Sequence, residues 1–288
     1  MTSAPKVGII VLNYNGGRRL LSCLSSLEQL DYPNKDVIIV DNGSGDDSCA
    51  SAAKQFPQFA FVRNGKNEGF AKGMNIGTRL ALERGARLIW LFNNDAETDR
   101  RTLSLLIAAA EAHPQAGLLS PVIYETESGD IWFAKGTIEY SRMRALHILP
   151  AKRELLSKAY PSGFLTGCAL LITKELIETI GFLDERFFLY YEDADYSLRA
   201  LAAGFLCLVV PEARVSHSEE SRSNLEKTYF LVHSGLLFFE KHAPLLLRPY
   251  LQAYVTIRRI KNVVDRLRGK GGAALEAYRA YQDYFHGR

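Results

Sequence analysis

Three short apolar runs, each followed at once by polar residues, constrain the fold of this chain most. They span residues 7–12, 37–40 and 88–92, and apolar residues recur at helical spacings over 20–27 and 70–83. Branched apolar runs of this length are typical of buried strands, and strands that alternate with helices form a mostly parallel sheet flanked by helices. The sequence therefore predicts an α/β fold with its ligand site at the carboxyl ends of the strands.

Polar side chains occupy all three of these strand ends, at residues 13–15, 41–44 and 93–95. Asp95 could hold a hard divalent cation, because Mg²⁺ and Mn²⁺ prefer oxygen ligands. Asp41 could accept hydrogen bonds from a nucleobase or a ribose. Asn, Asp, Gly and Ser are also typical of plain turns and helix caps, so both interpretations stay open at this point.

The loop at 67–73 is rich in small residues and opens the expected helix at 70–83. It matches neither a P-loop nor a GxGxxG motif, which argues against an ATPase and a nicotinamide-dependent enzyme. His217 lies in a short extended segment, where it could be a metal ligand or a structural histidine.

The segment FFLYYEDADY, residues 187–196, sets three carboxylates beside aromatic side chains. Acidic side chains are rarely buried without a partner, so Glu192 and Asp193 fit either a pocket or the first turn of a helix. The helix interpretation also pairs Asp195 with Arg199 at i,i+4. The two interpretations are compatible, since the start of a helix can hold Asp193 in a pocket.

The alternation of strands and helices weakens after Pro121. Residues 130–149 resemble an irregular hairpin, to which we assign no chemistry. A strand is expected over 205–210, with Pro211 as a breaker and a separate extended piece at 215–217.

Composition narrows the class of protein. The 288 residues, 47% hydrophobic and 23% charged, fit one large folded domain or one domain with a tail. A net charge of +3 gives no support for nucleic-acid binding. The four cysteines form no CxxC pair, which favours reduced thiols over disulfides or a zinc site. Without a signal-peptide core at residues 1–6 or the roughly 20 apolar residues of a membrane span, we expect a cytoplasmic protein.

A helix is expected over 225–242, followed by a basic tail at 246–288 in which apolar residues recur at helical spacings. A basic amphipathic helix can bind an anionic membrane surface, so we expect peripheral contact with the inner face of the cytoplasmic membrane. The alternative is a terminal helix packed on the core, with its lysines and arginines solvated.

Seven segments, in their usual order, resemble glycosyltransferase family 2 proteins with the GT-A fold, in particular their rhamnosyltransferase-like bacterial branch. They are VLNYNGG (11–17), VDNGSGD (40–46), NEGFAKGMNIG (67–77), WLFNNDAETD (90–99), GFLTGCALLI (163–172), GFLDERFFLYYEDADYSLRALAAGF (181–205) and PEARVSH (211–217). The resemblance implies a Rossmann-like, mostly parallel sheet in a GT-A domain over 1–245. A nucleotide-sugar-binding half (1–120) and an acceptor or catalytic half (121–245) would precede the helical tail at 246–288.

The resemblance also implies roles for the matching residues. Asp193 is the expected general base, with Gly167, Tyr191 and Glu192 on the acceptor side. The expected donor-binding residues are Asn13, Tyr14, Asn15, Asp41, Asn67, Gly69, Lys72, Asn93, Asn94 and Asp95. Mg²⁺ or Mn²⁺ would bind Asp95, His217 and Asn93, although asparagine stands at the first two places of the family's DxD motif. The branch often has Arg-Asn where this chain has His233 and Ser234, so the role of that pair is open.

These features together predict a metal-dependent inverting glycosyltransferase. A base takes the proton of an acceptor hydroxyl, and a cation neutralises the leaving nucleoside diphosphate. The expected donor is dTDP-rhamnose or a UDP-sugar, and the expected acceptor is a lipid-linked or growing cell-surface glycan. One alternative is a non-catalytic nucleotide-sugar-binding subunit of a polysaccharide assembly complex. A sugar nucleotidyltransferase is the other, although residues 13–18 match its basic glycine-rich loop poorly.

Overall fold

The computed structural model describes residues 4–218 and 225–287. Its strands are β1 Val7–Asn13, β2 Lys35–Asp41, β3 Ala60–Arg63, β4 Leu88–Asn93, β5 Ala96–Thr98, β6 Ala116–Glu125, β7 Ile131–Phe133, β8 Gly136–Glu139, β9 Arg144–His147, β10 Tyr160–Pro161, β11 Ala169–Thr173 and β12 Leu206–His217. Its helices are α1 Gly17–Glu28, α2 Ser48–Gln55, α3 Phe70–Glu83, α4 Thr102–Ala112, α5 Lys152–Leu155, α6 Lys174–Ile180, α7 Glu192–Ala202, α8 Leu225–His242, α9 Arg248–Leu267 and α10 Ala273–His286, with short 3₁₀ turns η1 Tyr140–Arg142 and η3 Leu245–Leu247.

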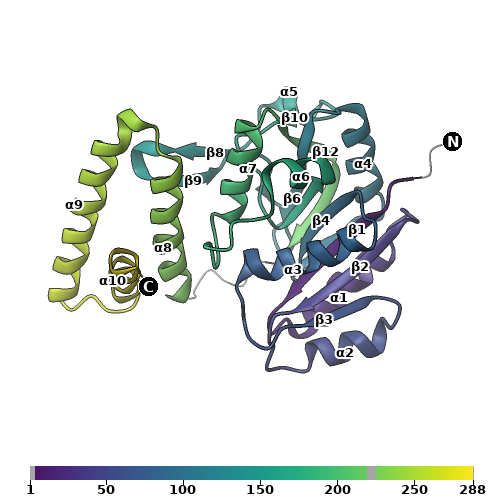
Figure 1. Ribbon diagram of the computed structural model, residues 1–288, viewed down its shortest axis with the longest axis horizontal. Helices are drawn as coiled ribbons and strands as arrows, with labels where there is room; N and C mark the ends of the chain where they lie inside the picture. The colour runs from purple at the N-terminus through teal and green to yellow at the C-terminus, as the bar shows by residue number, and fades with distance from the viewer. Residues whose placement is uncertain (1–3, 219–224, 288) are drawn as a thin grey trace.

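A mixed, mostly parallel sheet forms the centre of the molecule, in the order β10-β12-β6-β11-β4-β1-β2-β3 (Figure 1). Strands β4, β1, β2 and β3 run parallel, β12 runs parallel to β6, and β11 lies antiparallel between β4 and β6. Helices α3, α4, α6 and α7 pack against it, and its strands are buried because both faces are covered. The predicted α/β sheet with flanking helices and a helical carboxyl-terminal region is confirmed.

Parallel pairing brings the predicted polar strand ends together. Asn13 at the end of β1 is in register with Asp41 at the end of β2, and Leu12 is in register with Asn93 on β4. The side chains after these strands therefore meet at one edge of the sheet, as the sequence predicted.

Strand β12 differs from the prediction. Pro211 does not end it; the strand continues to His217 with a register shift against β6 between Val210 and Arg214. Proline is tolerated at such an irregularity because no regular ladder hydrogen bond is required there. Beyond the shift the strand also pairs with β5, where His217 is in register with Ala96. This pairing places His217 next to the end of β4.

The β8–β9 hairpin forms as expected, with Gly136 opposite His147. It extends from the sheet toward the tail (Figure 1). At its turn the carbonyls of Ser141 and Arg142 accept hydrogen bonds from Tyr250 and Tyr254 of α9, at 2.7 and 3.3 Å. The hairpin therefore connects the sheet to the tail.

Helix α8 and the two helices of the predicted tail, α9 and α10, form a lobe beside the sheet, and from here on this lobe is called the tail (Figure 1). Helix α10 packs along α8 and also contacts α9, whereas α9 and α8 have little direct contact. No helix in residues 4–218 and 225–287 is long and apolar enough to cross a membrane.

Asp195 on α7 joins this lobe to the sheet. Its side chain is fully buried and lies 2.9 Å from Arg199 Nε, 2.6 Å from Lys241 Nζ and 2.7 Å from His242 Nε2. The expected pair with Arg199 is present, but Asp195 is more than a partner for Arg199, because α8 supplies the other two contacts. Burial raises the pKa of Asp195, but hydrogen bonds from His242 and Lys241 outweigh that effect and lower it overall.

We predict that Asp195→Asn destabilises the protein, because the substitution leaves cations around a buried neutral side chain. Breaking a buried ion pair costs about 3–5 kcal/mol, so a loss of about 3 kcal/mol in the free energy of unfolding is expected at pH 7. The measurement is urea denaturation followed by circular dichroism. Glu178→Gln, which removes an exposed pair with Lys174, is the control and should have a much smaller effect.

The loss in the free energy of unfolding of Asp195→Asn should depend on pH. Because the folded-state pKa of Asp195 is lowered, its stabilisation is fully present above the unfolded-state pKa of about 3.9. It is lost as the pH falls through the lower folded-state pKa. Wild type and Asp195→Asn should therefore converge in stability in acid; equal stability at pH 7 would contradict the assignment.

Candidate active site

A cavity of about 470 Å³ opens where β4, β12 and the start of α7 meet. It contains seven of the residues that the sequence singled out. They are Asn93, Asp95, Gly167, Tyr191, Glu192, Asp193 and His217. Segments from both halves of the chain therefore converge on one space.

Asp193 lies in the first turn of α7 and faces this cavity. Its Oδ2 accepts a hydrogen bond from the Gly167 N–H at 2.9 Å, and its Oδ1 accepts one from the Ala194 N–H at 2.7 Å. Burial raises the pKa of Asp193, and the two backbone hydrogen bonds and the charge of His147 oppose that rise. A carboxylate that is oriented and more basic than usual suits proton abstraction.

Gly167 packs closely against Phe70 while its N–H contacts Asp193. A Cβ at this position would lie 3.2 Å from the ring of Phe70 and 3.6 Å from the Cβ of Asp193. The expected acceptor-side glycine therefore acts through its backbone N–H and its small size.

The turn before α7 has an unusual backbone. Tyr190 and Tyr191 both have φ of 68°, the left-handed conformation that non-glycine residues rarely adopt. Helix α8 supports this turn. The ring of Tyr191 packs 5.1 Å from that of Phe238, and the Ser234 hydroxyl donates a hydrogen bond to the Leu189 carbonyl at 2.8 Å.

The pair His233-Ser234 departs from the resemblance, and the structure separates its two members. Buried Ser234 holds the turn of the active site. His233 stacks on Tyr229, with ring centroids 5.8 Å apart, and lines a different cavity in the tail.

Glu192 is buried at the same cavity, and its Oε2 has no hydrogen-bond partner. Burial, and then the neighbouring charge of Asp193, raise the pKa of Glu192 well above its ordinary value. These effects favour the protonated form, which can donate a hydrogen bond to a bound polar ligand.

Asp95 and His217 face each other at the cavity, with His217 Nε2 3.2 Å from Asp95 Oδ1. Neither Asp95 Oδ1 nor His217 Nδ1 makes a hydrogen bond, although both atoms are buried. Within the described residues no group of three or more His, Cys, Asp or Glu side chains could hold a metal. Asp95, His217 and the amide oxygen of Asn93 nevertheless fit a cation that takes its remaining ligands from water and a substrate diphosphate.

Asn13 is fully buried beside this cavity. Its Nδ2 donates to the hydroxyls of Ser48 at 2.9 Å and Ser44 at 3.1 Å, and its Oδ1 accepts from Asn94 Nδ2 at 3.0 Å. Asn13 and Asn94 therefore bind each other and hold the ends of β1, β2 and β4 together.

The other predicted donor residues line the neighbouring strand ends, outside the 470 Å³ cavity. Tyr14 is half exposed, and Asp41 is buried with its Oδ2 3.5 Å from Arg63 Nε. Asn15 Oδ1 accepts from the Gly45 N–H at 2.8 Å, which ties the first two loops together.

The loop that opens α3 is fixed by its own contacts. Asn67 Oδ1 accepts from the Gly69 N–H at 2.9 Å, and Lys72 Nζ lies 2.7 Å from Glu68 Oε2. Gly69 has φ of 83°, and a Cβ there would lie 2.6 Å from the Phe188 carbonyl oxygen. Glycine is required at this contact between the two halves.

Residues 130–149, to which the sequence analysis assigned no chemistry, contribute to the cavity. Trp132 on β7 and His147 on β9 line the cavity together with Phe164. The Trp132 ring lies 4.8 Å from that of His147 and 4.6 Å from that of His217. A tryptophan and a histidine in an irregular, polar stretch were the only sequence signal for this aromatic wall.

The chain is similar to known glycosyltransferases. The family model described as "Glycosyl transferase family 2" matches residues 8–181. The dTDP-rhamnosyl transferase RfbF of Shigella flexneri is 25% identical over 253 residues, which cover 83% of this chain and 81% of that protein. The N-acetylglucosaminyl-diphospho-decaprenol L-rhamnosyltransferase of Mycobacterium tuberculosis (strain ATCC 25618 / H37Rv) is 27% identical over 231 residues, or 73% of this chain and 75% of that one.

A solved structure supports the fold. The mannosyltransferase PcManGT of Pyrobaculum calidifontis, in complex with GDP-Man and Mn²⁺, superposes with a TM-score of 0.62 at 18% identity. The match covers 100% of this chain and 77% of that one.

Proposed function

Because this chain belongs to glycosyl transferase family 2, we propose that it is an inverting, metal-dependent glycosyltransferase with Asp193 as its general base. The observation that carries the proposal is one cavity with Asp193 on one wall and the Asp95–His217 pair on another. An acceptor hydroxyl needs a base that takes its proton, which Asp193 would supply. A departing diphosphate needs positive charge, which a cation at Asp95 and His217 would supply.

The proposed reaction is a single displacement. The acceptor oxygen attacks the anomeric carbon of the donor sugar while the bond from that carbon to the diphosphate breaks, so the configuration inverts. Asp193 takes the hydroxyl proton, and its hydrogen bonds to the Gly167 and Ala194 N–H groups keep it oriented. Protonated Glu192 would donate a hydrogen bond to the sugars.

Mg²⁺ or Mn²⁺ is the proposed cofactor. Asp95, His217 and Asn93 would hold it, and it would supply positive charge to the departing diphosphate. Support comes from the unpartnered polar atoms of Asp95 and His217 and from Mn²⁺ in the similar mannosyltransferase.

The proposed donor is dTDP-rhamnose, with a UDP-sugar as the other nucleotide class. The printed activities of two relatives, a dTDP-rhamnosyl transferase and an L-rhamnosyltransferase, support it. The nucleoside would lie over the strand ends that Asn13 holds together, near Tyr14, Asn15, Asp41 and the 67–73 loop. The name of the second relative also supports the proposed acceptor, a lipid-linked or growing glycan.

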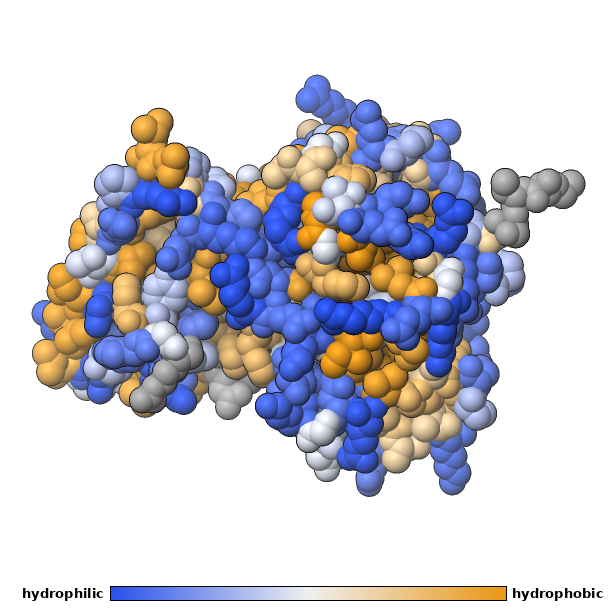
Figure 2. Space-filling view, viewed as in Figure 1, coloured by the Kyte–Doolittle hydropathy of each residue, from blue (hydrophilic) through white to orange (hydrophobic). Residues whose placement is uncertain are grey.

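The proposed location is the inner face of the cytoplasmic membrane. Helix α9 carries an outward apolar stripe beside arginines and lysines, and Figure 2 shows apolar side chains gathered over the tail. The stripe, which we call the outer stripe, consists of Tyr250, Ile257, Ile260, Val264 and Leu267. Such a surface fits an anionic bilayer.

Replacing the proposed base tests the function. Asp193→Asn should lower transfer from dTDP-rhamnose by about 10²–10⁴-fold and leave the donor Kd, measured by calorimetry, unchanged. Glu178→Gln on the exposed face of α6 is the control and should keep full activity. Persistent transfer by Asp193→Asn would remove Asp193 from the role. A wild type that binds donor but transfers to no acceptor glycan would favour the non-catalytic subunit.

Metal dependence has its own test. Removal of divalent ions by EDTA should abolish transfer, and added Mn²⁺ should restore it. His217→Asn should raise the Mn²⁺ concentration for half-maximal activity by tenfold or more, whereas His286→Asn, near the end of α10, should not. An unchanged Mn²⁺ requirement in His217→Asn would exclude that side chain as a ligand.

Membrane contact can be measured by co-sedimentation with phosphatidylglycerol vesicles. The double variant Ile257→Glu/Ile260→Glu places two acids in the outer stripe and should release the protein from the vesicles. Leu156→Glu changes an exposed leucine directly after α5, away from the tail. This variant is the single-charge control and should still bind. Unchanged binding of the double variant would show that α9 does not face the membrane.

A further inference from the structure

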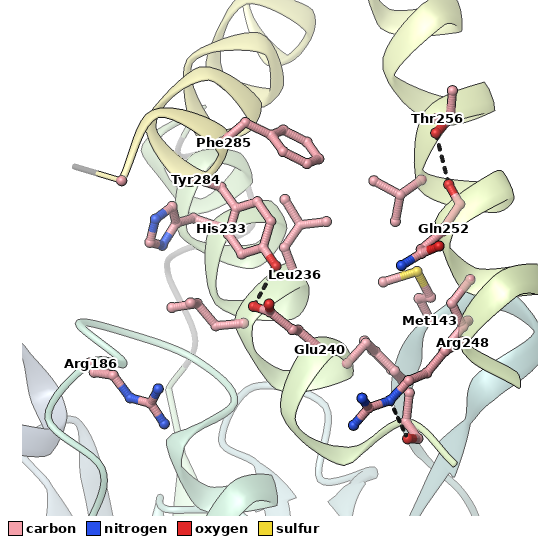
Figure 3. Close-up of a pocket in the computed structure, with 16 residues that line it drawn as sticks. Met143, Arg186, His233, Leu236, Glu240, Arg248, Gln252, Thr256, Tyr284 and Phe285 are labelled. Atoms are coloured by element: carbon pink, nitrogen blue, oxygen red, sulfur yellow. Dashed lines mark hydrogen bonds between the residues drawn. The ribbon is translucent and has the colours of Figure 1, made fainter. Parts of the chain in front are cut away.

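A second cavity, of about 1010 Å³, lies inside the tail (Figure 3). Facing sides of α8 and α9 form its walls, α10 contributes Tyr284 and Phe285 at one end, and Met143 of the hairpin closes it elsewhere. Helices that pack directly have axes 8–10 Å apart and leave no such space. Helix α10 contacts both α8 and α9 and so holds them apart. We call this cavity the tail groove.

About half of the side chains that line the tail groove are apolar, and the others include His233, Gln252 and Thr256. The apolar side chains include Leu236, Leu237, Phe239, Ala243, Leu251 and Val255. These residues recur at helical spacing on α8 and α9, so apolar side chains of the two helices face each other across the groove. Leu236, Phe239, Ala243 and Leu251 are buried by their neighbours. Leu237 and Val255 are only partly buried, and their uncovered surface favours an apolar occupant. The volume is in the range of ligand pockets, which is about 300–1,000 Å³.

The groove also has a charged end. Arg186 and Arg248 lie on opposite sides of the groove with Glu240 between them, and Phe285 and Thr256 lie farther along the groove (Figure 3). Arg186 forms an ion pair with Asp184, in which Nη2 lies 2.6 Å from Oδ2. Arg248 has no ion-pair partner among residues 4–218 and 225–287. The acid of the groove, Glu240, accepts a hydrogen bond from Tyr284 at 2.6 Å. The groove is therefore suited to a chain with an anionic group at the arginine end.

The groove shares two walls with the active site. On α8, Leu231 lines the active-site cavity and Leu236 lines the groove. On the hairpin, Ala145 lines the active-site cavity and Met143 lines the groove. Helix α8 and the hairpin therefore separate the two cavities, and a ligand in the groove lies against the outer side of the active-site wall.

We propose that the tail groove holds the hydrocarbon chain of a lipid-linked acceptor, with the diphosphate of that lipid at Arg186 and Arg248. The proposal rests on the proposed function, because it takes a glycan on a lipid diphosphate as the acceptor. It goes further by assigning the chain to a binding site inside the tail, separate from the outer stripe. The groove selects acceptors by their lipid, and the active-site cavity selects them by their sugar.

The test is calorimetric titration with farnesyl diphosphate, which joins a fifteen-carbon chain to a diphosphate. EDTA is present, so that a diphosphate cannot bind through a metal at Asp95. Val255→Trp fills the groove from α9 and should raise the Kd for this probe by tenfold or more. Ile257→Trp adds the same side chain to the outer stripe and should leave the Kd within twofold. Circular dichroism melting curves verify that both variants are folded.

Two further probes identify what is bound. Inorganic pyrophosphate lacks the chain and should bind at least tenfold more weakly than farnesyl diphosphate. Arg248→Gln should weaken farnesyl diphosphate but not farnesol, which lacks the diphosphate. Equal affinity for pyrophosphate and farnesyl diphosphate, or an unchanged Kd in Val255→Trp, would overturn the proposal. Equally tight, Val255→Trp-sensitive binding of palmitoyl lysophosphatidate would assign the groove to membrane phospholipid instead.

The results of these titrations do not depend on whether the protein transfers a sugar. If dTDP-rhamnose is not a donor, the transfer assay fails while the titration still reports on the groove. If the groove is empty of lipid, the titration fails while transfer to a soluble glycan acceptor persists.

Discussion

The contacts of buried Asp195 with Lys241 and His242 fix α8 against α7, and the turn that leads into α7 depends on that contact. Helix α8 then reaches the turn before α7 with Ser234 and Phe238. Two consecutive residues in the left-handed conformation cost of order 1–3 kcal/mol each and persist only where surrounding contacts require them. The ion cluster lies in the first turn of α7 and therefore helps to hold the strained turn that comes directly before it.

Two adjacent carboxylates acquire different chemistry from their surroundings. Asp193 receives two backbone N–H groups, which offset part of the rise in its pKa that burial causes. Glu192 is buried beside it with an unpartnered oxygen, so burial and the charge of Asp193 raise its pKa well above normal. Environments that push two pKa values apart separate the proton acceptor from the neutral donor. A base and a hydrogen-bond donor thus stand side by side on one helical turn.

Much of the fold could be predicted from the sequence because it follows from local patterns. Apolar spacing gave helices at 70–83 and 225–242, which are the observed bounds of α3 and α8. The meeting of Asn13 and Asp41 follows from parallel pairing of β1 with β2, which the alternating elements already require. Local patterns could not indicate that Asn13 and Asn94 would bind each other beneath the surface, because that depends on the spacing of three strand ends.

The features that the sequence did not reveal all arise from contacts between distant segments. Trp132 and His147 reach the cavity because β7 adds to the edge of β6 and the hairpin folds back. The tail groove exists because α10 keeps α9 off α8. The resemblance implied that His217 and Asp95 share a site, but not the register shift of β12 and its pairing with β5 that bring them together. Regular strand–helix units build the strand ends that Asn13 holds together, whereas the aromatic wall and the tail groove depend on the hairpin and the tail. The hairpin and the tail can therefore change without disturbing those strand ends.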